Sequence, residues 1–193
     1  MSTPSSILST AYDLFTRRGY HGTSMRAIAK DAGIALGGIY NHFQSKEDIF
    51  REVILAYHPY HEILPAIAAA EYDTLEGLFR EAAALIDSAL SERPELLNLM
   101  FIELVEFDSR HVPELLERIL PQVQQTLARF DLSGERLRPI PVPMVWRVFI
   151  GTILGYFLSK QALGPTIPPE FREHALDRFV DVFLRGILEP EHK

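Results

Sequence analysis

Two glutamates three residues apart, Glu103 and Glu106, come closest in this chain to a catalytic pair by type and spacing. On a helix they would share one face, and the segment around them, residues 95 to 107, is otherwise almost entirely apolar. Two carboxylates in such surroundings could act as general acid and general base, or could hold a cationic ligand. The simpler interpretation, which we favour, is that they form structural ion pairs with Arg147 or Arg118.

Other catalytic or metal-binding patterns are weaker still. His58 and His61 are three residues apart, but Pro59 between them breaks a regular helix and no further ligand cluster lies nearby in sequence. The chain has no cysteine, which excludes disulfides, thiolate zinc sites and a cysteine nucleophile. The sequence also lacks a glycine-rich phosphate loop and the GxSxG and HExxH patterns. We therefore expect no enzymatic activity, no metal and no cofactor.

Lys46 is a candidate of a different kind, for binding an anion. Ser45 before it is a good helix N-cap, and Glu47 and Asp48 fall in the first turn, where negative charge suits the helix dipole. A lysine beside the free backbone N–H groups of a helix N-terminus makes an anion site. The pattern therefore predicts an anion site where a helix begins.

Two short helices joined by a glycine turn are predicted just before this site. Residues 24 to 32 place their apolar side chains at helical spacing. Gly33 follows at once, where a helix C-cap needs a residue that accepts a positive φ. Residues 36 to 43 can then form two more turns. This arrangement is the helix-turn-helix pattern, whose second helix enters the major groove of DNA.

A wider pattern of residues surrounds these two helices, over roughly residues 4 to 55. Its members are Phe15, Gly19, Tyr20, Thr23, Ser24, Ile28, Ala29, Ala32, Gly33, Ile34, Gly37, Ile39, Tyr40, Phe43, Ser45, Lys46, Glu47 and Asp48. Taken together they resemble the DNA-binding domain of TetR-family transcriptional regulators. Beyond them only length and helical character agree with that family.

The resemblance implies which residues meet DNA. Phosphate contacts would come from Thr23, Ser24, Tyr40, His42 and Lys46. Base edges would be reached from Arg26, Ala35, Leu36, Gly38 and Asn41. Asn41 can pair with adenine through two hydrogen bonds, and Leu36 can touch a thymine methyl group. The alternative is that Tyr40 and His42 belong to the packing of a small domain.

The predicted recognition helix departs from the family in one respect. Many relatives carry Ser, Thr or Lys where this chain has Ala35, Leu36 and Gly38, so fewer hydrogen bonds to bases are available and DNA shape gains weight. Gly37 and Gly38 also lower helix propensity, by roughly 1 kcal/mol each relative to alanine. In exchange they let the backbone approach the groove closely.

Composition and charge fit a globular DNA-binding protein. The 193 residues are 47% hydrophobic and 23% charged, which allows a real core. The net charge is −7, but the first 58 residues carry +1 and the remainder −8. The N-terminus lacks the features of a signal peptide, and the most apolar run, residues 148 to 158, is far shorter than the ~20 residues of a membrane span. We expect a soluble, cytoplasmic protein.

The chain shows no strand alternation and no internal repeat, which predicts an all-α fold. We expect a helix-turn-helix DNA-binding domain over residues 1 to 58 and a helical effector-binding and dimerisation domain over residues 59 to 193. Besides the helices above, helices are predicted over residues 4–18, 45–57, 75–90, 95–107, 113–130, 144–163 and 170–188. Pro65 is expected to interrupt residues 60 to 72, and Pro121 to bend or split its helix. Residues 131 to 143 are predicted to form a loop.

The last two predicted helices carry wide apolar faces. The resemblance implies that these helices pair with those of a second subunit in a four-helix interface. We place in it Val148, Thr152, Gly155, Phe179 and Phe183, with Gly151 and Gly155 allowing close backbone approach. The alternative is that both faces are buried within their own subunit.

The resemblance also implies an effector pocket in the C-terminal bundle, suited to an apolar or aromatic compound. Its candidate lining residues are Phe101, Glu103, Phe107, Trp146, Phe149 and Tyr156. The expected function is a ligand-responsive repressor that binds a pseudo-palindromic operator as a homodimer and is released by the effector. One alternative is a helical small-molecule-binding or enzymatic protein whose head binds a protein partner. Another, within the same family, is an activator or a ligand-independent regulator.

Overall fold

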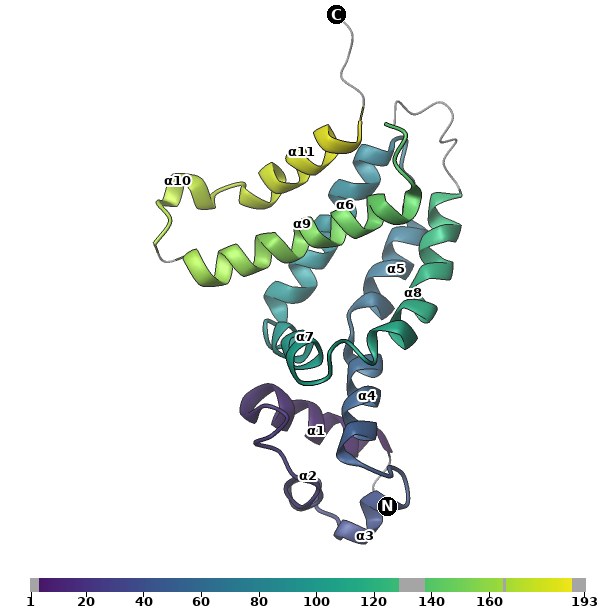
Figure 1. Cartoon of the computed structure of the whole chain (residues 1–193), viewed down its shortest axis with the longest axis vertical. Coiled ribbons are helices and arrows are strands. Elements are labelled where there is room, and N and C mark those ends of the chain that lie inside the picture. Colours follow the sequence, from purple (N-terminus) through teal and green to yellow (C-terminus); the bar gives the residue numbers. More distant parts are fainter. Residues whose placement is uncertain (1–3, 129–137, 165, 189–193) are drawn as a thin grey trace, which may run out of the picture. The chain divides into compact units, whose positions relative to one another are not determined.

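A computed structural model describes residues 4–128, 138–164 and 166–188 of the chain, and these residues are almost entirely helical (Figure 1). The all-α prediction is confirmed. The helices of the described residues are α1 (Pro4–Arg18), α2 (Met25–Asp31), α3 (Leu36–Tyr40), α4 (Lys46–Tyr57), α5 (Tyr60–Ala69), α6 (Leu75–Glu92), α7 (Glu95–Glu106), α8 (Val112–Leu127), α9 (Val142–Leu163), α10 (Pro169–Arg172) and α11 (Ala175–Ile187).

Helix α1 is amphipathic and ends where the sequence predicts. It buries Ile7, Ala11, Leu14 and Phe15 on one face. Gly19 follows the helix with φ of +72°, a conformation that costs glycine little. The buried face packs against α4, where the rings of Phe15 and Phe50 meet edge to face with centroids 5.3 Å apart.

The turn between α2 and α3 also forms as predicted. Ser24 caps α2 by accepting a hydrogen bond from the Ala27 N–H, and Gly33 adopts φ of +69°. No atom lies within 4 Å of the position that a Cβ on Gly33 would take, so its backbone conformation rather than crowding calls for glycine. Helix α3 ends at Tyr40 and is shorter than predicted. It has no side-chain N-cap, and two of its five residues are glycines, which weaken a helix.

The chain forms two compact units. The first contains residues 1–64 and 88–123, and the second contains residues 65–87 and 124–193. This grouping differs from the predicted boundary at residue 58, because α7 packs on the helix-turn-helix region. Within the first unit the Tyr12 hydroxyl donates to Glu95, and the Phe107 ring stacks on Phe50 with centroids 4.8 Å apart.

The second unit has its own aromatic core. The Phe79 ring of α6 lies 5.0 Å from that of Phe149 on α9 and 4.9 Å from that of Phe183 on α11. All three side chains are buried. Arg80 also joins α6 to α11, through an ion pair with Asp181 at 2.6 Å. These contacts hold α9 and α11 side by side (Figure 1).

Two predictions of helix boundaries were wrong, and a third was wrong in part. Pro65 does not interrupt its helix, since α5 runs through it, and α8 is not split at Pro121. The predicted helix over residues 170 to 188 is instead divided into α10 and α11. His174 between them has φ of +55°, in the left-handed region, so the helix cannot pass through it. Most of the predicted loop over residues 131 to 143, and the end of the helix predicted to residue 130, lie outside the described residues.

Helix α9 is longer than the apolar run from which we judged it. Its 22 residues are long and apolar enough to cross a membrane by length and composition alone. Helices of soluble proteins pass the same test, and α9 contributes Phe149, Ile153 and Phe157 to the core of the second unit. Its other faces carry exposed apolar side chains.

Candidate nucleic-acid interface

The predicted recognition helix is anchored by two buried side chains, and its exposed polar residues lie at its C-terminal end. Ile39 is fully buried and Phe43 is 5% exposed, so they fix α3 against the rest of the head. Exposed residues around this anchor come from α2, α3 and the segment after it. They are Ser24, Arg26, Ala35, Gly37, Tyr40, Asn41 and His42, and Leu36 and Gly38 are half-buried. The structure thus brings most of the predicted DNA-contacting residues to the surface of two adjoining helices.

Tyr40 and His42 are not part of the packing. Tyr40 is 54% exposed, and His42 is exposed as well. The alternative in which both are core residues of a small domain therefore does not fit the structure. A tyrosine hydroxyl and an imidazole on an exposed surface are free to donate hydrogen bonds to a phosphate.

Thr23 is placed differently from the prediction. Its side chain is 1% exposed, its hydroxyl donates to the Gly19 carbonyl at 2.9 Å, and its backbone N–H donates to the Tyr20 carbonyl. Both donors are therefore used inside the loop between α1 and α2. Thr23 shapes this loop, and the neighbouring Ser24 is the residue that faces outward.

Lys46 also has partners that the sequence did not indicate. Its Nζ donates to the carbonyls of Tyr20 and Thr23, each at 2.7 Å, and lies 4.0 Å from the centre of the Tyr20 ring. Burial lowers the pKa of Lys46. Two of the three ammonium protons are therefore committed to the α1–α2 loop, so Lys46 fastens this loop to α4 rather than standing free to bind an anion.

Two hydrogen bonds cap the N-terminus of α4. Ser45 Oγ accepts from the Asp48 N–H at 3.0 Å, and Asp48 Oδ2 accepts from the Gln44 N–H at 3.1 Å. This reciprocal arrangement resembles a capping box, with the N–H of Gln44 bound in place of that of the N-cap Ser45, and it fixes the chain between α3 and α4. The N-cap predicted at Ser45 is confirmed.

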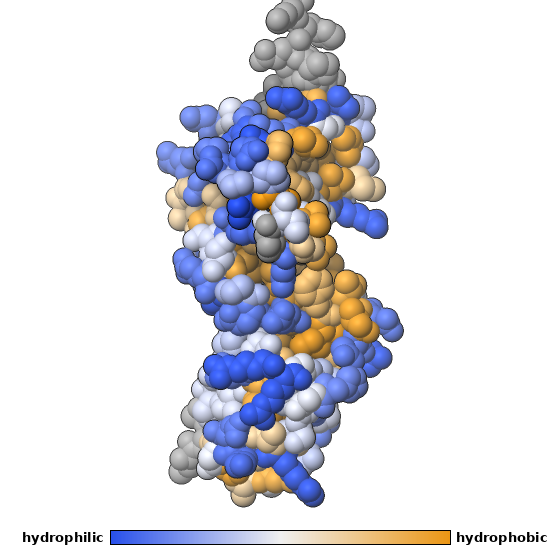
Figure 2. All heavy atoms as spheres, turned by 90° about the vertical axis from the view of Figure 1, so that its left-hand side faces the viewer, coloured by the Kyte–Doolittle hydropathy of each residue, from blue (hydrophilic) through white to orange (hydrophobic). Residues whose placement is uncertain are grey.

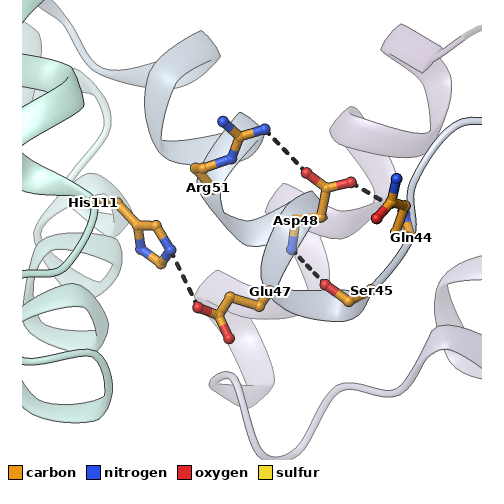
Figure 3. A pocket seen from close by; sticks show the side chains of 6 residues that line it. All are labelled: Gln44, Ser45, Glu47, Asp48, Arg51 and His111. Atoms are coloured by element: carbon orange, nitrogen blue, oxygen red, sulfur yellow. Dashed lines mark hydrogen bonds and ion pairs between the residues drawn. The ribbon is translucent and has the colours of Figure 1, made fainter.

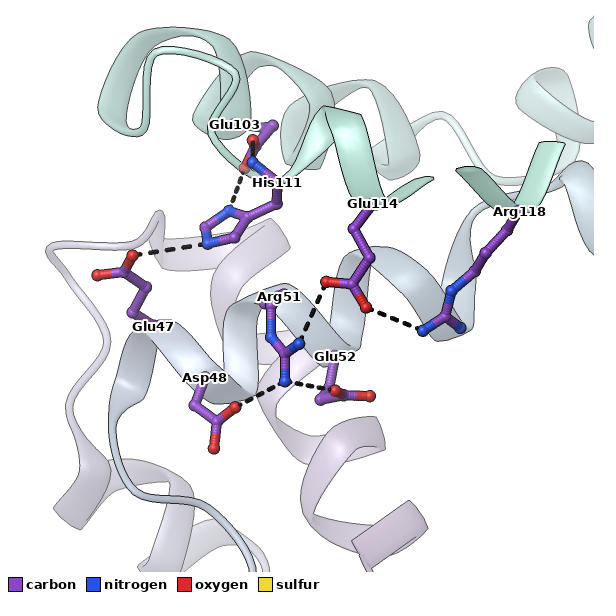
Figure 4. Close-up of polar contacts among 8 residues, drawn as sticks. All are labelled: Glu47, Asp48, Arg51, Glu52, Glu103, His111, Glu114 and Arg118. Carbon is purple, nitrogen blue, oxygen red and sulfur yellow. Dashed lines mark hydrogen bonds and ion pairs between the residues drawn. The ribbon is translucent and has the colours of Figure 1, made fainter. Parts of the chain in front are cut away.

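A polar hollow of about 350 Å³ opens beside this cap (Figure 3). Its lining residues are Gln44, Ser45, Glu47, Asp48, Arg51 and His111. Arg51 donates to Asp48, Glu52 and Glu114, and so joins α4 to α8 (Figure 4). Sequence reasoning missed the contacts of His111 with Glu47 and of Arg51 with Glu114, because these residues are distant along the chain and no spacing rule connects them.

Glu103 and Glu106 have histidine partners, not the predicted arginines. Glu103 is 1% exposed, and its carboxylate accepts from the backbone N–H and from Nδ1 of His111, at 2.7 Å and 2.8 Å. Glu106 pairs with His21. Arg118 pairs with Glu114. The two glutamates therefore have different neighbours and do not form an acid–base pair.

Three of the six predicted pocket residues lie in the first unit. Phe107 is buried between the rings of Tyr20 and Phe50, and Glu103 is bound to His111, so both belong to the core of that unit. Phe101 is 36% exposed on α7. The predicted pocket loses Glu103 and Phe107 because their side chains are used in packing beneath the head.

The other three predicted pocket residues lie in the second unit. Phe149 is buried among Phe79, Phe183 and Trp146, and Tyr156 is 8% exposed against Phe157 and Phe179. The Trp146 Nε1 atom is buried and has no hydrogen-bond partner among the described residues. An indole N–H in such a place lacks an acceptor.

The predicted dimer residues differ in how far they are exposed. Val148 is 45% exposed, and Thr152 and Phe179 are half-buried. Phe183 is 3% exposed, so it packs inside its own subunit, as the alternative interpretation held for it. A Cβ on Gly155 would lie 3.9 Å from Phe179, which places this glycine at the contact of α9 with α11. Exposed apolar residues that we did not predict are Ile150, Leu154 and Leu158.

The histidines at the junction of α4 and α5 have protein partners. His58 Nδ1 accepts from the Tyr60 N–H at 3.2 Å, and His61 Nε2 lies 2.8 Å from the Leu55 carbonyl. Burial, followed by the nearby His61, lowers the pKa of His58 to about 4. Among the described residues no group of three His, Asp or Glu side chains is placed to hold a metal ion.

The fold and this surface define a helix-turn-helix protein, and comparison with known proteins identifies its family. Residues 7–53 match the family model of bacterial regulatory proteins of the tetR family. The chain is 23% identical over 188 residues to the HTH-type transcriptional regulator YvkB of Bacillus subtilis, covering 94% of this chain and 95% of YvkB. It is 28% identical over 130 residues to the HTH-type transcriptional repressor KstR2 of Mycolicibacterium smegmatis, covering 67% of this chain and 55% of KstR2.

Solved structures share the fold over the full length. FadR of Bacillus subtilis, in a complex with stearoyl-CoA, has a TM-score of 0.76 at 21% identity, with 96% of this chain and all of that chain covered. NalD of Pseudomonas aeruginosa, a secondary repressor of a multidrug efflux pump, has a TM-score of 0.69 at 20% identity, with 97% and 98% covered. Residues 7–53 therefore form a DNA-binding domain of the TetR family, and the chain as a whole is similar to transcriptional regulators. The comparisons identify a DNA-binding transcriptional regulator.

Proposed function

We propose that this regulator is a repressor that binds a pseudo-palindromic operator as a homodimer and leaves it when a small apolar or aromatic effector binds. The observation that carries the proposal is the exposed polar surface of α2 and α3 over the buried anchor Ile39. Each subunit would place α3 in the major groove. Two-fold symmetry then sets the two recognition helices about one turn of DNA apart, ~34–36 Å.

The exposed residues divide into two kinds of DNA contact. Ser24, Tyr40 and His42 are proposed to bind phosphates and so to position the head. Arg26 and Asn41 are proposed to read base edges, and Leu36 to touch a thymine methyl group. Ala35, Gly37 and Gly38 carry no donors, and at Gly37 a Cβ would meet nothing within 4 Å, so this surface is open to the groove. Lys46 supports these contacts from behind, by holding the loop that precedes Ser24.

A homodimer is supported by the exposed apolar side chains of α9. Val148, Ile150, Leu154 and Leu158 are each between 40% and 48% exposed, an unusual concentration for one helix of a soluble protein. A second copy of the chain would cover them, with Thr152, Gly155 and Phe179 nearby. We take the protein to be cytoplasmic, and residues 1–58 and 59–193 to be its DNA-binding and regulatory parts.

An effector site in the second unit is supported by its aromatic core. Trp146, Phe149 and Tyr156 lie on one helix, and the Trp146 Nε1 lacks an acceptor among the described residues. An apolar compound with one hydrogen-bond acceptor would suit such surroundings. The FadR neighbour was solved with stearoyl-CoA, whose acyl chain is apolar. The effector would release DNA only to the extent that it binds the DNA-free arrangement more tightly.

Repression is supported by relatives, since KstR2 and NalD are both named repressors. The relatives are named as regulators, which disfavours the alternative of an enzyme whose head binds a protein partner. We propose no enzymatic activity.

The decisive experiment is selection of bound DNA from a random duplex pool, with the purified protein at near-physiological salt. The expected result is enrichment of a two-fold symmetric sequence. Asn41→Ala is the matched variant, and it should lose preference at one base position in each half-site. Binding without enrichment, which disappears as salt rises, would contradict the proposal, since it would be electrostatic attraction alone.

A further inference from the structure

A buried carboxylate, an imidazole and a second carboxylate form a chain from α7 to α4 (Figure 4). Glu103 holds His111 by its backbone N–H and by Nδ1, and His111 Nε2 lies 3.6 Å from Glu47 Oε1. His111 is 7% exposed, and the rings of Phe50 and Phe107 lie against it. Glu47 is in the first turn of α4. The chain therefore ends on the helix that follows the recognition helix.

The proton count of this chain decides whether its last contact is attractive. When the pair of Glu103 and His111 holds a single proton, it lies on Nδ1, and Nε2 presents a lone pair to the Glu47 carboxylate. When the pair holds two protons, Nε2 carries an N–H that points at Glu47. In this two-proton state Nε2 carries an N–H whether the shared proton lies on Glu103 or on Nδ1 of His111. One added proton thus replaces a lone pair that faces the Glu47 carboxylate with an N–H that is attracted to it.

The turn before His111 is built to aim at Glu47. Asp108 and Ser109 have φ of +50° and +60°, two consecutive non-glycine residues in the left-handed region. Such strain persists only where the surroundings impose it. Here the Ser109 N–H donates to the Glu103 carbonyl at 3.0 Å, and the Glu103 carboxylate holds the His111 N–H. The turn also brings Arg110 Nη1 to within 3.0 Å of the same Glu47 oxygen.

The contact reaches the recognition helix through a short, well-tied connection. Glu47 lies between Ser45 and Asp48, whose reciprocal cap fixes the segment leading back to Phe43. Lys46 ties the same turn of α4 to the loop before α2. Glu47 therefore lies in a turn that is tied by hydrogen bonds to the segments leading to both helices of the proposed DNA-binding surface.

We propose that the Glu103–His111–Glu47 chain is a proton-dependent clasp that positions the DNA-binding head. Glu103 and His111 are positioning residues, and protonation of the pair strengthens DNA binding because the head is then held in place before it meets DNA. Charged groups that face His111 are Glu103 from α7, Glu47, Asp48 and Arg51 from α4, and Arg110 from its own turn. Since the contact between His111 and Glu47 depends on one proton, pH is the variable that tests the clasp.

The test compares DNA affinity at pH 6 and pH 8 in wild type and Glu47→Gln, and its DNA arm rests on the proposed function. Lowering the pH from 8 to 6 should increase the DNA affinity of wild type about threefold more than it increases that of Glu47→Gln. About threefold is the scale expected for a half-exposed ion pair. Glu114→Gln is the matched control. It removes another carboxylate that joins α8 to α4, through Arg51, but has no imidazole partner. The pH dependence of its DNA affinity should equal that of wild type. Any contribution of His21 or His42 to this pH dependence should be the same in wild type and in both variants.

Thermal unfolding at the same two pH values separates the clasp from the DNA-binding proposal. The melting temperature of wild type minus that of Glu47→Gln should be larger at pH 6 than at pH 8, whether or not the protein binds DNA. Equal pH dependence of wild type and Glu47→Gln, in both affinity and melting temperature, would overturn the clasp. Failure of every variant to bind DNA at either pH, with the melting difference intact, would instead overturn the proposed operator binding.

Discussion

The helices α3 and α9 carry exposed surfaces of opposite character. Around α3 the exposed side chains are mostly polar and surround one buried anchor, Ile39. Along α9 the buried Phe149, Ile153 and Phe157 alternate with exposed Val148, Ile150 and Leu154. Figure 2 shows hydrophobic side chains gathered at the surface in several places on one face of the molecule. The first surface is stable in water and suits a charged partner, whereas the second requires an apolar one.

The largest expected effect comes from placing a charge on the apolar surface. Leu154→Glu should dissociate the proposed dimer and reduce operator affinity by about a hundredfold or more, because a charge would be buried without a partner. Sedimentation and DNA binding measure the two results. Leu104→Glu is the control, since Leu104 on α7 is 59% exposed and lies in the first unit. A dimer that survives Leu154→Glu would remove the contrast between the two helices.

Substitutions on the polar surface around α3 should change DNA binding rather than the oligomeric state. Asn41→Ala should cost about 1–3 kcal/mol of binding at one base position, because a paired amide contact is lost. Tyr40→Phe should weaken binding similarly on all sequences, since it removes one phosphate contact. Competition between operators that differ at single positions distinguishes the two. A uniform loss with Asn41→Ala would place Asn41 among the phosphate contacts.

Acid should weaken the first unit through His58. The pKa of this half-buried imidazole is lowered to about 4, below the value of an unfolded chain, so the unfolded state binds a proton first as pH falls. Its stabilisation is complete above about pH 6.5 and should be lost between that value and pH 4, by up to about 2 kcal/mol. Denaturant unfolding at several pH values measures the slope. His58→Gln should reduce the slope, and an unchanged slope would exclude His58.

The smallest expected effect separates the two roles of Lys46. Lys46→Met keeps the aliphatic stem but loses two hydrogen bonds to backbone carbonyls, which should cost about 1 kcal/mol of stability because the group is partly exposed. DNA affinity should fall, while its dependence on salt concentration stays the same. A flatter salt dependence would show a direct phosphate contact, as the sequence first indicated.

Local signals in the sequence predicted the local structure of the head well. The caps at Ser24 and Ser45 and the positive φ of Gly19 and Gly33 depend on a few neighbouring residues, so their pattern is visible in the sequence. Pro65 and Pro121 misled the prediction, because helices tolerate a proline when surrounding contacts hold them. The left-handed His174 had no sequence signal, since glycine or asparagine is the usual residue there.

The candidate site was predicted only in part. Exposure of Arg26, Tyr40 and Asn41 followed from their places on short amphipathic helices. The positions of Thr23 and Lys46 did not, because a polar side chain near DNA and one that satisfies a loop carbonyl have the same sequence. Partners of Glu103 were also unpredictable, since His111 reaches it through a strained turn.

The sequence alone determined the helical fold, the glycine turn and the polar recognition surface, because each follows from propensity, spacing and capping among near neighbours. Tertiary structure decided which charges meet and which apolar faces stay open. Those outcomes depend on segments far apart in the chain, such as Glu47 with His111 and Phe79 with Phe183. Burial then sets the energy of each contact, and no local pattern encodes the burial that a distant helix provides.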